Sequence, residues 1–401
     1  MSLNLTEKVT FDETLRRKDF FTHHPYASTT YNNNDVINIP IQHQDSSTFP
    51  WESFINMKGL FVKKSDGTVT NSKIVKNGYS HLFCDFKYKV GGVEVAQTRK
   101  LGVTTTMKGY VSHSREDLGV LKNSGWEENS VGKTTGAFDV CIPLKMWMGY
   151  FEDQTRAIIN MKQEITLVRA STDENAYITD PEDPQPSKFI ITEITWNVPH
   201  LCVSDEQRLE LLNIVKSGKP LPLSFRCWEL IEHPLLPATN RHIWQVKTVQ
   251  NLESPRFILI AFQTNRNGVL DRDASKFDHC NLISATAYLN SEYYPHTKIY
   301  NNFETGEFSR LYREYADFQV AYYGKNNPSP LLDPSEFKSI APIIVLNTSY
   351  QNETVKSGSI DIRIELEAHA NFPPNTTAYC LILHDRVIEY VPLTSIVNRI
   401  I

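Results

Sequence analysis

The sequence predicts an all-β protein made of two tandem jelly-roll β-sandwich domains (a double jelly-roll), with short helices in its loops. Three observations predict this fold class: the chain length of 401 residues, strand-like alternation of apolar and polar residues, and an internal repeat. Single hydrophobic cores stop growing near about 250–300 residues, so a chain of this length is expected to contain two. The 20 Phe, 18 Tyr and 21 Pro residues favour strands joined by long loops.

The strand signals are clearest in three segments. In Ser359–Ala368, isoleucine and leucine alternate with charged residues, which is typical of a strand with one buried and one wet face. Met161–Ala170 shows the same alternation, with Met161, Ile165 and Leu167 expected to point inward. Phe257–Phe262 is continuously apolar and is expected to form a strand buried on both faces.

Four dipeptides indicate turns. Gly91-Gly92 separates two strand-like segments, and a Gly-Gly pair readily adopts the positive φ angles of a tight hairpin. Asn290-Ser291 is expected to form a second hairpin, and Asn267-Gly268 and His384-Asp385 to form further turns.

Two segments are expected to be helical. Phe308–Tyr323 places large apolar residues at helical spacing and is followed by Gly324. Glu206–Lys216 is a shorter amphipathic candidate, with Ser204 as its N-cap and Gly218 just beyond its end.

A shift of 199 residues superposes the two halves of the chain without gaps. It lays Leu60 on Leu259 and the Gly91-Gly92 hairpin on Asn290-Ser291. It also aligns Glu116–Gly125 with Tyr315–Gly324, Pro143 with Pro342, and the alternation at Met161 with that at Ile360. Repeats of this size indicate two similar domains rather than a solenoid. Each half would hold about eight short strands, which suits a jelly roll.

We therefore expect an N-terminal arm over residues 1–36, a first jelly roll over 37–200 and a second over 201–401. The arm is polar. The long polar loops Thr172–Ser187 and Asn326–Glu336 are expected to interrupt the strands.

The formal net charge of −5 and the lack of a concentrated basic segment argue against strong direct binding of nucleic acid. Met1–Arg17 lacks the apolar core of a signal peptide, and no apolar run approaches the length of a membrane span. The six cysteines are scattered without a C-x-x-C pair, so we expect reduced thiols.

The nearest approaches to catalytic motifs are incomplete. Gly132-Lys133-Thr134 lacks the first glycine of a phosphate-binding loop, because Glu127 stands there. Gly78–Leu82 resembles half of a nucleophile elbow but lacks its closing glycine. The acidic pairs Glu127-Glu128 and Glu182-Asp183 are interpreted as solvated loops.

The nearest approaches to metal sites are also incomplete. Asp271–Lys276 begins like a calcium loop but has Lys276 where the sharp turn needs glycine, and is interpreted as a solvated loop. His279-Cys280 and His23-His24 lack a second ligand pair, so we interpret them as a core thiol and surface histidines. We expect no enzyme, no catalytic residues, no cofactor and no metal.

Three stretches resemble a known family. They are Ile37–Gly59, which begins I-N-I-P-I-Q-H-Q-D; Val93–Trp126, which ends N-S-G-W; and Arg256–Pro295 taken with Ser357–Tyr390, which holds S-I-D-I-R-I-E-L-E-A. In order and across both halves, they resemble the double jelly-roll major capsid proteins of the adenovirus-like and Polinton lineage. Within that family, the sequence looks like the small adintovirus-like versions and the endogenous copies in arthropod genomes.

The resemblance implies a homotrimer whose six rolls form a pseudo-hexameric capsomer that tiles an icosahedral shell. Its partners would be neighbouring capsomers and penton or minor capsid proteins. The protein would reside in the virion capsid after assembly inside the host cell.

Two alternatives stay open at this point. One is a domesticated capsid-like protein that forms genome-free particles. The other is a jelly-roll carbohydrate-binding module that stacks sugars on aromatic residues such as Trp147, Tyr293 and Tyr294.

Overall fold

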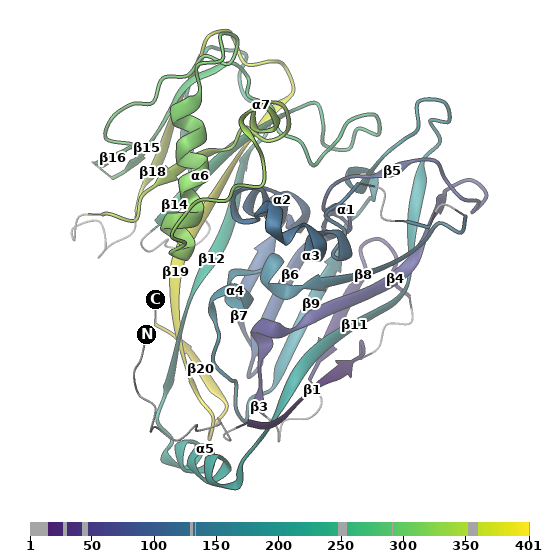
Figure 1. Cartoon of the computed structure of the whole chain (residues 1–401), viewed down its shortest axis with the longest axis vertical. Coiled ribbons are helices and arrows are strands. Elements are labelled where there is room, and N and C mark those ends of the chain that lie inside the picture. The colour runs from purple at the N-terminus through teal and green to yellow at the C-terminus, as the bar shows by residue number, and fades with distance from the viewer. Residues whose placement is uncertain are drawn as a thin grey trace, which may run out of the picture.

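The computed structural model contains two β-sandwiches that lie side by side, with their long strands roughly along the long axis of the molecule (Figure 1). The structure describes residues 15–26, 30–41, 47–128, 131–132, 134–247, 255–290, 292–351 and 360–400. The predicted all-β double jelly-roll fold is confirmed.

The first sandwich consists of two antiparallel sheets. One has the order β1 (Leu15–His23), β11 (Ser187–Val203), β4 (Phe54–Lys63) and β8 (Ala137–Pro143), with β3 (Ser47–Thr48) also paired to β11. The other has the order β2 (Val36–Pro40), β9 (Gln163–Arg169), β6 (Phe83–Val90) and β7 (Val93–Arg99). A small ribbon of β5 (Lys73–Ile74) and β10 (Tyr177–Ile178) lies beside them.

The second sandwich repeats this arrangement. One sheet has the order β12 (Leu221–His233), β19 (Thr376–Val391), β14 (Pro255–Thr264) and β17 (Ile344–Asn347), with β20 (Ile396–Arg399) paired to β19. The other has the order β13 (Arg241–Val246), β18 (Ile362–Ala368), β15 (Leu282–Leu289) and β16 (Glu292–Tyr294). Each sheet of the first sandwich thus has a counterpart whose strands follow the chain in the same order.

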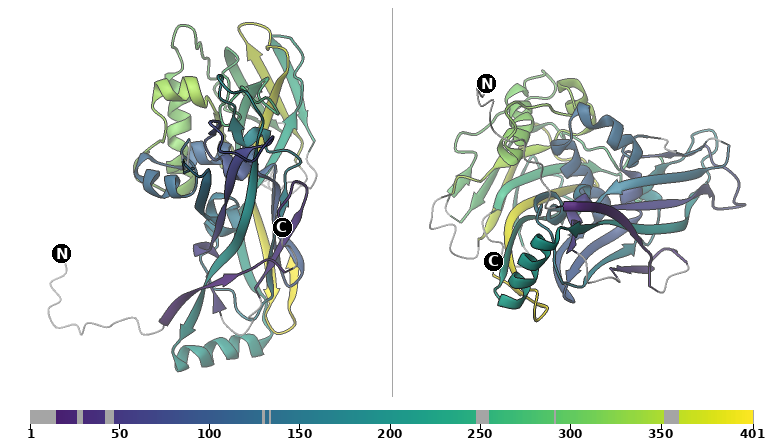
Figure 2. Two further views of the ribbon diagram at one scale, coloured as in Figure 1. Left: turned by 90° about the vertical axis from the view of Figure 1, so that its right-hand side faces the viewer. Right: turned by 60° about the horizontal axis from the view of Figure 1, so that its bottom comes forward.

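The helices occupy the connections between strands. They are α1 (Gly78–His81), α2 (Leu101–Ser112), α3 (Leu118–Asn123), α4 (Gly149–Asp153), α5 (Asp205–Ser217), α6 (Ser309–Tyr323) and α7 (Pro334–Ile340). Short 3₁₀ turns cover Pro50–Glu52, Arg115–Asp117, Leu144–Met146 and Glu174–Ala176. Seen from the side, a group of helices projects from one face of the strands, whereas α5 lies at the lower end (Figure 2). Among the described helices, none is long and apolar enough to cross a membrane.

The 199-residue repeat is gapless in three strands of one pair of sheets, whereas the edge strands β2 and β13 of that pair begin 205 residues apart, at Val36 and Arg241. Strands β6 and β15 begin at Phe83 and Leu282, and β9 and β18 begin at Gln163 and Ile362, so both pairs are 199 residues apart. The register is conserved as well, because Phe86 faces Leu167 and Ala285 faces Leu366. Both pairings even shift register at the same place, after Phe83 and after Leu282.

In the other pair of sheets, equivalent strands are not separated by 199 residues. Strand β4 begins at Phe54 and β14 at Pro255, two residues beyond the common offset. Pro143 ends β8, whereas Pro342 precedes β17, so the predicted match of these two prolines is wrong. Insertions in the connecting loops change the residue offset between equivalent strands, and the order of the strands in the sheet stays the same.

The predicted burial of the strands and the predicted hairpins are confirmed. Ile362, Ile364 and Leu366 are fully buried in β18, and β14 is buried from Phe257 to Phe262. The Gly91-Gly92 hairpin joins β6 to β7 with positive φ at both glycines. Asn290 ends the β15 side of the second hairpin with φ 55°, and Asn267-Gly268 is a turn; Ser291 lies outside the described residues.

The predicted turn at His384-Asp385 is wrong. Both residues lie within β19, opposite Cys227 and Arg226 of β12. The polar pair stays in the strand because the Asp385 carboxylate is ion-paired with Arg256 of the neighbouring strand β14.

Both predicted helices are confirmed. Helix α6 ends at Gly324, which has φ 67°, and α5 begins after Ser204, whose side chain accepts a hydrogen bond from the backbone N–H of Gln207. Helix α2 was not predicted.

Part of the expected N-terminal arm forms a strand. Residues Leu15–His23 form β1, which pairs antiparallel with β11 of the same chain. The pairing satisfies its backbone hydrogen bonds, although only His23 of this strand is buried.

Candidate functional site at the junction of the two sandwiches

The serine of the incomplete nucleophile elbow is locked in the core. Ser80 is fully buried in α1, donates to Oδ1 of Asn77 over 2.6 Å, and accepts from the indole Nε1 of Trp147 over 2.8 Å. Burial lowers the pKa of the adjacent His81 to about 4. A hydroxyl held in this way is a structural element of the core.

The predicted solvated loop at Asp271–Lys276 is partly wrong, because Asp273, Ala274 and Ser275 are buried. The Asp273 carboxylate accepts from the backbone N–H and hydroxyl of Ser275. Among the described residues, no group of three or more His, Cys, Asp and Glu side chains could hold a metal ion.

The predicted surface histidine His23 is buried. Its Nε2 lies 3.2 Å from Nε2 of His200 on β11. Of the aromatic residues considered for sugar stacking, Trp147 and Tyr294 are buried and only Tyr293 is exposed. Of the phosphate-loop residues, Lys133 lies outside the described residues.

The most elaborate polar arrangement lies where the two sandwiches meet. Arg226 on β12 donates from Nε and from its backbone N–H to Oδ2 of Asp153 at the end of α4, over 2.9 and 2.7 Å. The guanidinium lies 3.5 Å from the ring centroid of Tyr322 on α6. Helix α4 approaches β12 so closely that a Cβ on Gly149 would lie 2.0 Å from the carbonyl oxygen of Arg226. Only glycine therefore fits at this contact.

A buried lysine lies next to this pair. Lys108 on α2 is 2% exposed and donates to Oε1 of Glu152 on α4 over 3.1 Å. It also donates to the phenol oxygen of Tyr323 over 2.8 Å, and its ammonium lies 4.3 Å from the ring centroid of Tyr322. Tyr322 and Tyr323 both donate to Glu152 in turn. The cluster therefore joins two helices of the first sandwich to α6 of the second.

The electrostatics of this cluster follow from its burial. Burial lowers the pKa of Lys108, and the nearby Glu152 carboxylate opposes that shift. Burial and the charge of Glu152 raise the pKa of Tyr322 and Tyr323 well above the usual value of a phenol. Buried ion pairs are conditional stabilisers, because removing one partner leaves the other charge desolvated and uncompensated.

The two hydrophobic cores also exchange elements across the junction. Helix α2 comes from the first half of the chain but packs its Met107, Tyr110 and Val111 into the core of the second sandwich. Conversely, the lower parts of β12 and β19 place apolar side chains in the core of the first sandwich: Leu223, Phe225, Ile388 and Tyr390. Tyr315 of α6 donates to the carbonyl oxygen of Tyr110 over 2.7 Å. The two rolls are therefore joined by shared packing of their cores.

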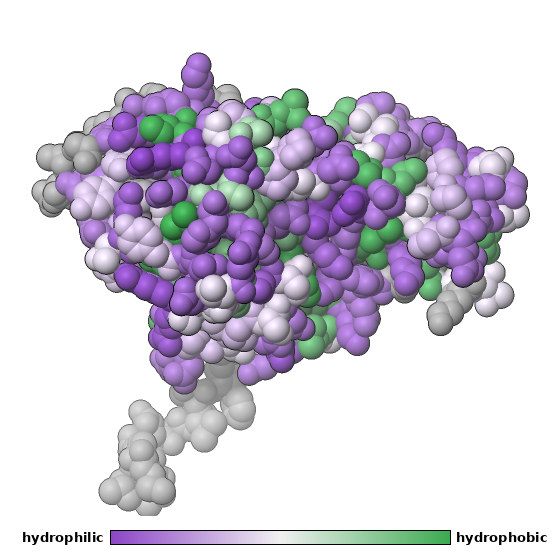
Figure 3. All heavy atoms as spheres, turned by 90° about the horizontal axis from the view of Figure 1, so that it is seen from above, coloured by the Kyte–Doolittle hydropathy of each residue, from purple (hydrophilic) through white to green (hydrophobic). Residues whose placement is uncertain are grey.

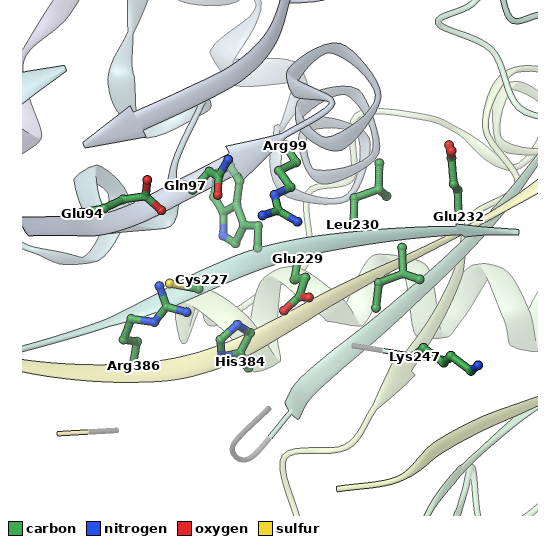
Figure 4. A pocket seen from close by; sticks show the side chains of 12 residues that line it. Glu94, Gln97, Arg99, Cys227, Glu229, Leu230, Glu232, Lys247, His384 and Arg386 are labelled. Atoms are coloured by element: carbon green, nitrogen blue, oxygen red, sulfur yellow. The ribbon is translucent and has the colours of Figure 1, made fainter. Parts of the chain in front are cut away.

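A small cleft of about 220 Å³ opens along this junction (Figure 4). Strand β7 contributes Glu94, Gln97 and Arg99 to one side, and β12 and β19 contribute most of the other. Arg386 crosses it by donating to the carbonyl oxygen of Val95 over 3.2 Å. Charges of both signs line the cleft, and it contains no concentrated electrostatic site.

The molecule also exposes apolar side chains at one end. Helix α5 has no buried residue, and Leu209 and Leu212 are 63% and 54% exposed. Phe20 on β1 is 50% exposed. Grouped apolar residues at a surface are typical of protein contact sites.

Sequence reasoning alone did not find the residues of the junction. Arg226, Asp153 and Lys108 belong to no short motif and come from three distant segments. The run of Val and Thr in α2 is a weak helix signal.

Comparison with known proteins identifies what this architecture is similar to. Residues 72–388 match the model of the double jelly roll-like domain. No curated protein matches the chain in sequence. Among solved structures, the chain is similar to the PBCV-1 protein VP54 fitted into a reconstruction of the virophage Sputnik, with a TM-score of 0.65, 9% identity and 99% of each chain covered.

Two further capsid structures are similar. The Faustovirus major capsid protein has a TM-score of 0.62 and 10% identity, with 97% of this chain and 92% of that chain covered. The mavirus major capsid protein has a TM-score of 0.58 and 11% identity, with 100% of this chain and 93% of that chain covered. At these identities the likeness establishes the shared fold.

Proposed function

The chain belongs to the double jelly roll-like domain family, and from this premise we propose that it is a major capsid protein that builds the wall of a viral shell. The support is that the similar solved structures are capsid proteins aligned over nearly their full length. Fold alone is a weak guide to function, so the proposal also depends on the geometry of this chain.

The observation that carries the proposal is the equivalence of the two sandwiches. Each has two four-stranded paths in the same order, and three strands of one pair of sheets share their offset and register, with a common register shift between two of them. Three such chains around a threefold axis would present six similar units. A homotrimer would therefore form a pseudo-hexameric capsomer that can tile an icosahedral shell.

The closely packed junction suits this role. A shell subunit must keep its two rolls at a fixed angle, and the exchanged core elements and the Lys108 and Arg226 clusters do so. Exposed apolar residues of α5 and β1 are available for contacts with other subunits. Neighbouring capsomers and penton or minor capsid proteins complete the proposed set of partners.

In this proposal the protein acts by assembly and has no catalytic activity, and the genome is handled by other components. The net charge of −5 favours that division of labour. The site of action is the virion capsid, with assembly inside the host cell. We also propose the division into an arm (1–36), a first roll (37–200) and a second roll (201–401), with β1 of the arm held against the first roll.

Light scattering on the purified full-length chain, followed by negative-stain microscopy, tests the proposal. We expect the mass of a trimer and six-sided particles or closed shells. A monomer at tens of micromolar that forms no particles on concentration would overturn it. Nucleic-acid content of particles purified from the native source would separate a viral capsid from a domesticated, genome-free one.

A further inference from the structure

A larger cavity, of about 920 Å³, opens at the end of the second sandwich that lies farthest from α5. The strand register fixes this position: Thr264 and Thr376 pair at the cavity end of the sheet, whereas Leu221 and Tyr390 pair near α5. Its walls come from the ends of β14 and β15, from α7, and from the loop before β19. We propose that this cavity, which we call the distal pocket, binds an acidic carbohydrate, a function beyond shell building.

One wall of the distal pocket is a preorganised polar surface. Arg266 donates from Nε and Nη2 to the two carboxylate oxygens of Asp278, over 3.1 and 2.6 Å. The backbone N–H of Thr264 donates to the same carboxylate over 2.8 Å. Both charged side chains remain partly exposed, at 16% and 26%. A fixed fork of this kind presents donors and acceptors without reorganisation.

The backbone of the distal pocket is strained. Asn265, Cys280 and Asn281 line it, and their φ angles are 52°, 45° and 47°. Left-handed backbone is unfavourable for a residue such as cysteine and persists where the surroundings impose it, often at ligand sites. The backbone N–H of Asn281 donates to Nδ1 of His279, which fixes the loop in this shape.

The charge of the distal pocket favours an anion. Asp278 is neutralised by Arg266, which leaves Arg272 and Lys338 in the lining. Within the part of the chain that the structure describes, neither of these cations forms an ion pair, and Lys338 donates instead to the carbonyl oxygen of Phe303. The net positive charge is therefore available to a ligand.

The size and lining of the distal pocket favour a sugar over other anions. A volume of about 920 Å³ far exceeds that of one inorganic ion. The amides of Asn265 and Asn371 match a ligand rich in hydroxyl groups. The hydroxyls of Ser335 and Ser339 donate to Asp333 and to the carbonyl oxygen of Ser335, so their oxygens are the atoms that can accept from a ligand. Single-stranded nucleic acid would need exposed aromatic rings for stacking. In this lining, Phe277 is 2% exposed and the ring of His279 is already stacked on Phe303. The upper face of the molecule is mainly hydrophilic (Figure 3).

Calorimetric titration of the purified full-length protein tests the inference. The probe is a sulfated heparin-derived tetrasaccharide, compared with its desulfated form, inorganic sulfate and an oligothymidylate. We expect saturable binding of the sulfated sugar that weakens as salt is added. The variants Arg272→Ala and Arg272→Ala/Lys338→Ala should bind progressively more weakly, by about tenfold for the double variant.

Arg310→Ala is the matched control, because Arg310 is an exposed cation of the same sandwich that does not line the distal pocket. It should change the affinity less than twofold. Absence of saturable sugar binding, unchanged binding by the double variant, or equally tight binding of inorganic sulfate or oligothymidylate would each refute the inference. A trimer that binds no sugar would refute the sugar site and leave the proposed capsid function intact. A monomer that binds sugar would support the sugar site and refute the proposed capsid function.

Discussion

Arg226 of the second sandwich and Asp153 of the first form a charge pair whose Nε and Oδ2 atoms are 2.9 Å apart. The pair is largely shielded, with 23% and 12% of the two side chains exposed. Tyr322 covers the guanidinium from a third element, α6. This contact fixes one roll against the other, and its strength can be measured.

Asp153→Ala should lower the free energy of unfolding by about 3 kcal/mol, because it leaves the Arg226 guanidinium without its carboxylate. Chemical denaturation followed by tryptophan fluorescence measures the change. Glu127→Ala is the control, since its pair with Lys122 is more than half exposed and should contribute less than about 1 kcal/mol. Equal effects of the two substitutions would show that the junction pair is no stronger than a surface pair.

Lys108→Met should also destabilise the protein by about 3 kcal/mol, because Glu152 loses its cationic partner in a buried setting. Adding Glu152→Gln should recover part of the loss, with a coupling of at least about 1 kcal/mol in a double-mutant cycle. The exposed pair of Lys58 and Glu193 has the same 3.1 Å separation and provides the control cycle. Equal coupling in both cycles would contradict the expected role of burial.

The protein should lose stability between pH 6.5 and pH 4. Burial lowers the pKa of His81 to about 4, and burial followed by the charge of Arg386 lowers that of His384 to about 4. In the unfolded chain both would titrate near 6.5. The unfolded state therefore binds more protons in this window. As the pH is lowered from 6.5 to 4, the free energy of unfolding decreases by up to about 3 kcal/mol per histidine.

Thermal unfolding at pH 7 and pH 4.5 checks this expectation. His384→Gln removes one titrating group, so the variant should lose less stability over that interval than the unsubstituted protein. An identical loss in the two proteins would show that His384 does not contribute.

Gly109→Ala should destabilise the protein by about 1–3 kcal/mol through overpacking. A Cβ at this position in α2 would lie 2.2 Å from Cη2 of Trp126, whose ring is held edge-on against Tyr110. Gly119→Ala is the control in α3, where an added Cβ meets nothing within 4 Å. It should be neutral or stabilise the protein by up to about 1 kcal/mol. Melting temperatures of the two variants decide the comparison.

Local sequence patterns predicted the structure correctly where a particular residue type is needed for a particular backbone conformation. The caps of α5 and α6 were identified by Ser204 and Gly324, and the first hairpin by the two glycines that adopt positive φ. The same local reasoning misassigned His384-Asp385 as a turn, because the Arg256 partner that keeps Asp385 in a strand is distant in sequence.

Helix α2 was missed for a physical reason. It is buried almost all round, so it lacks the one-sided apolar stripe that identifies a surface helix. Its valine and threonines favour strands when considered locally. Helix α2 is stabilised mainly by its packing against α6 and the core of the second sandwich.

The sequence by itself determined the number of rolls, several of their strands, and a 199-residue repeat that survives in the register of three strands of one pair of sheets. Those properties arise from alternation, turns and caps, which act over a few residues. Only the tertiary structure decided that α2 enters the opposite core, that Lys108 and Arg226 lie beside Glu152 and Asp153, and that cations gather in the distal pocket. Such contacts join segments far apart in the chain, and their energies depend on burial that no local pattern encodes.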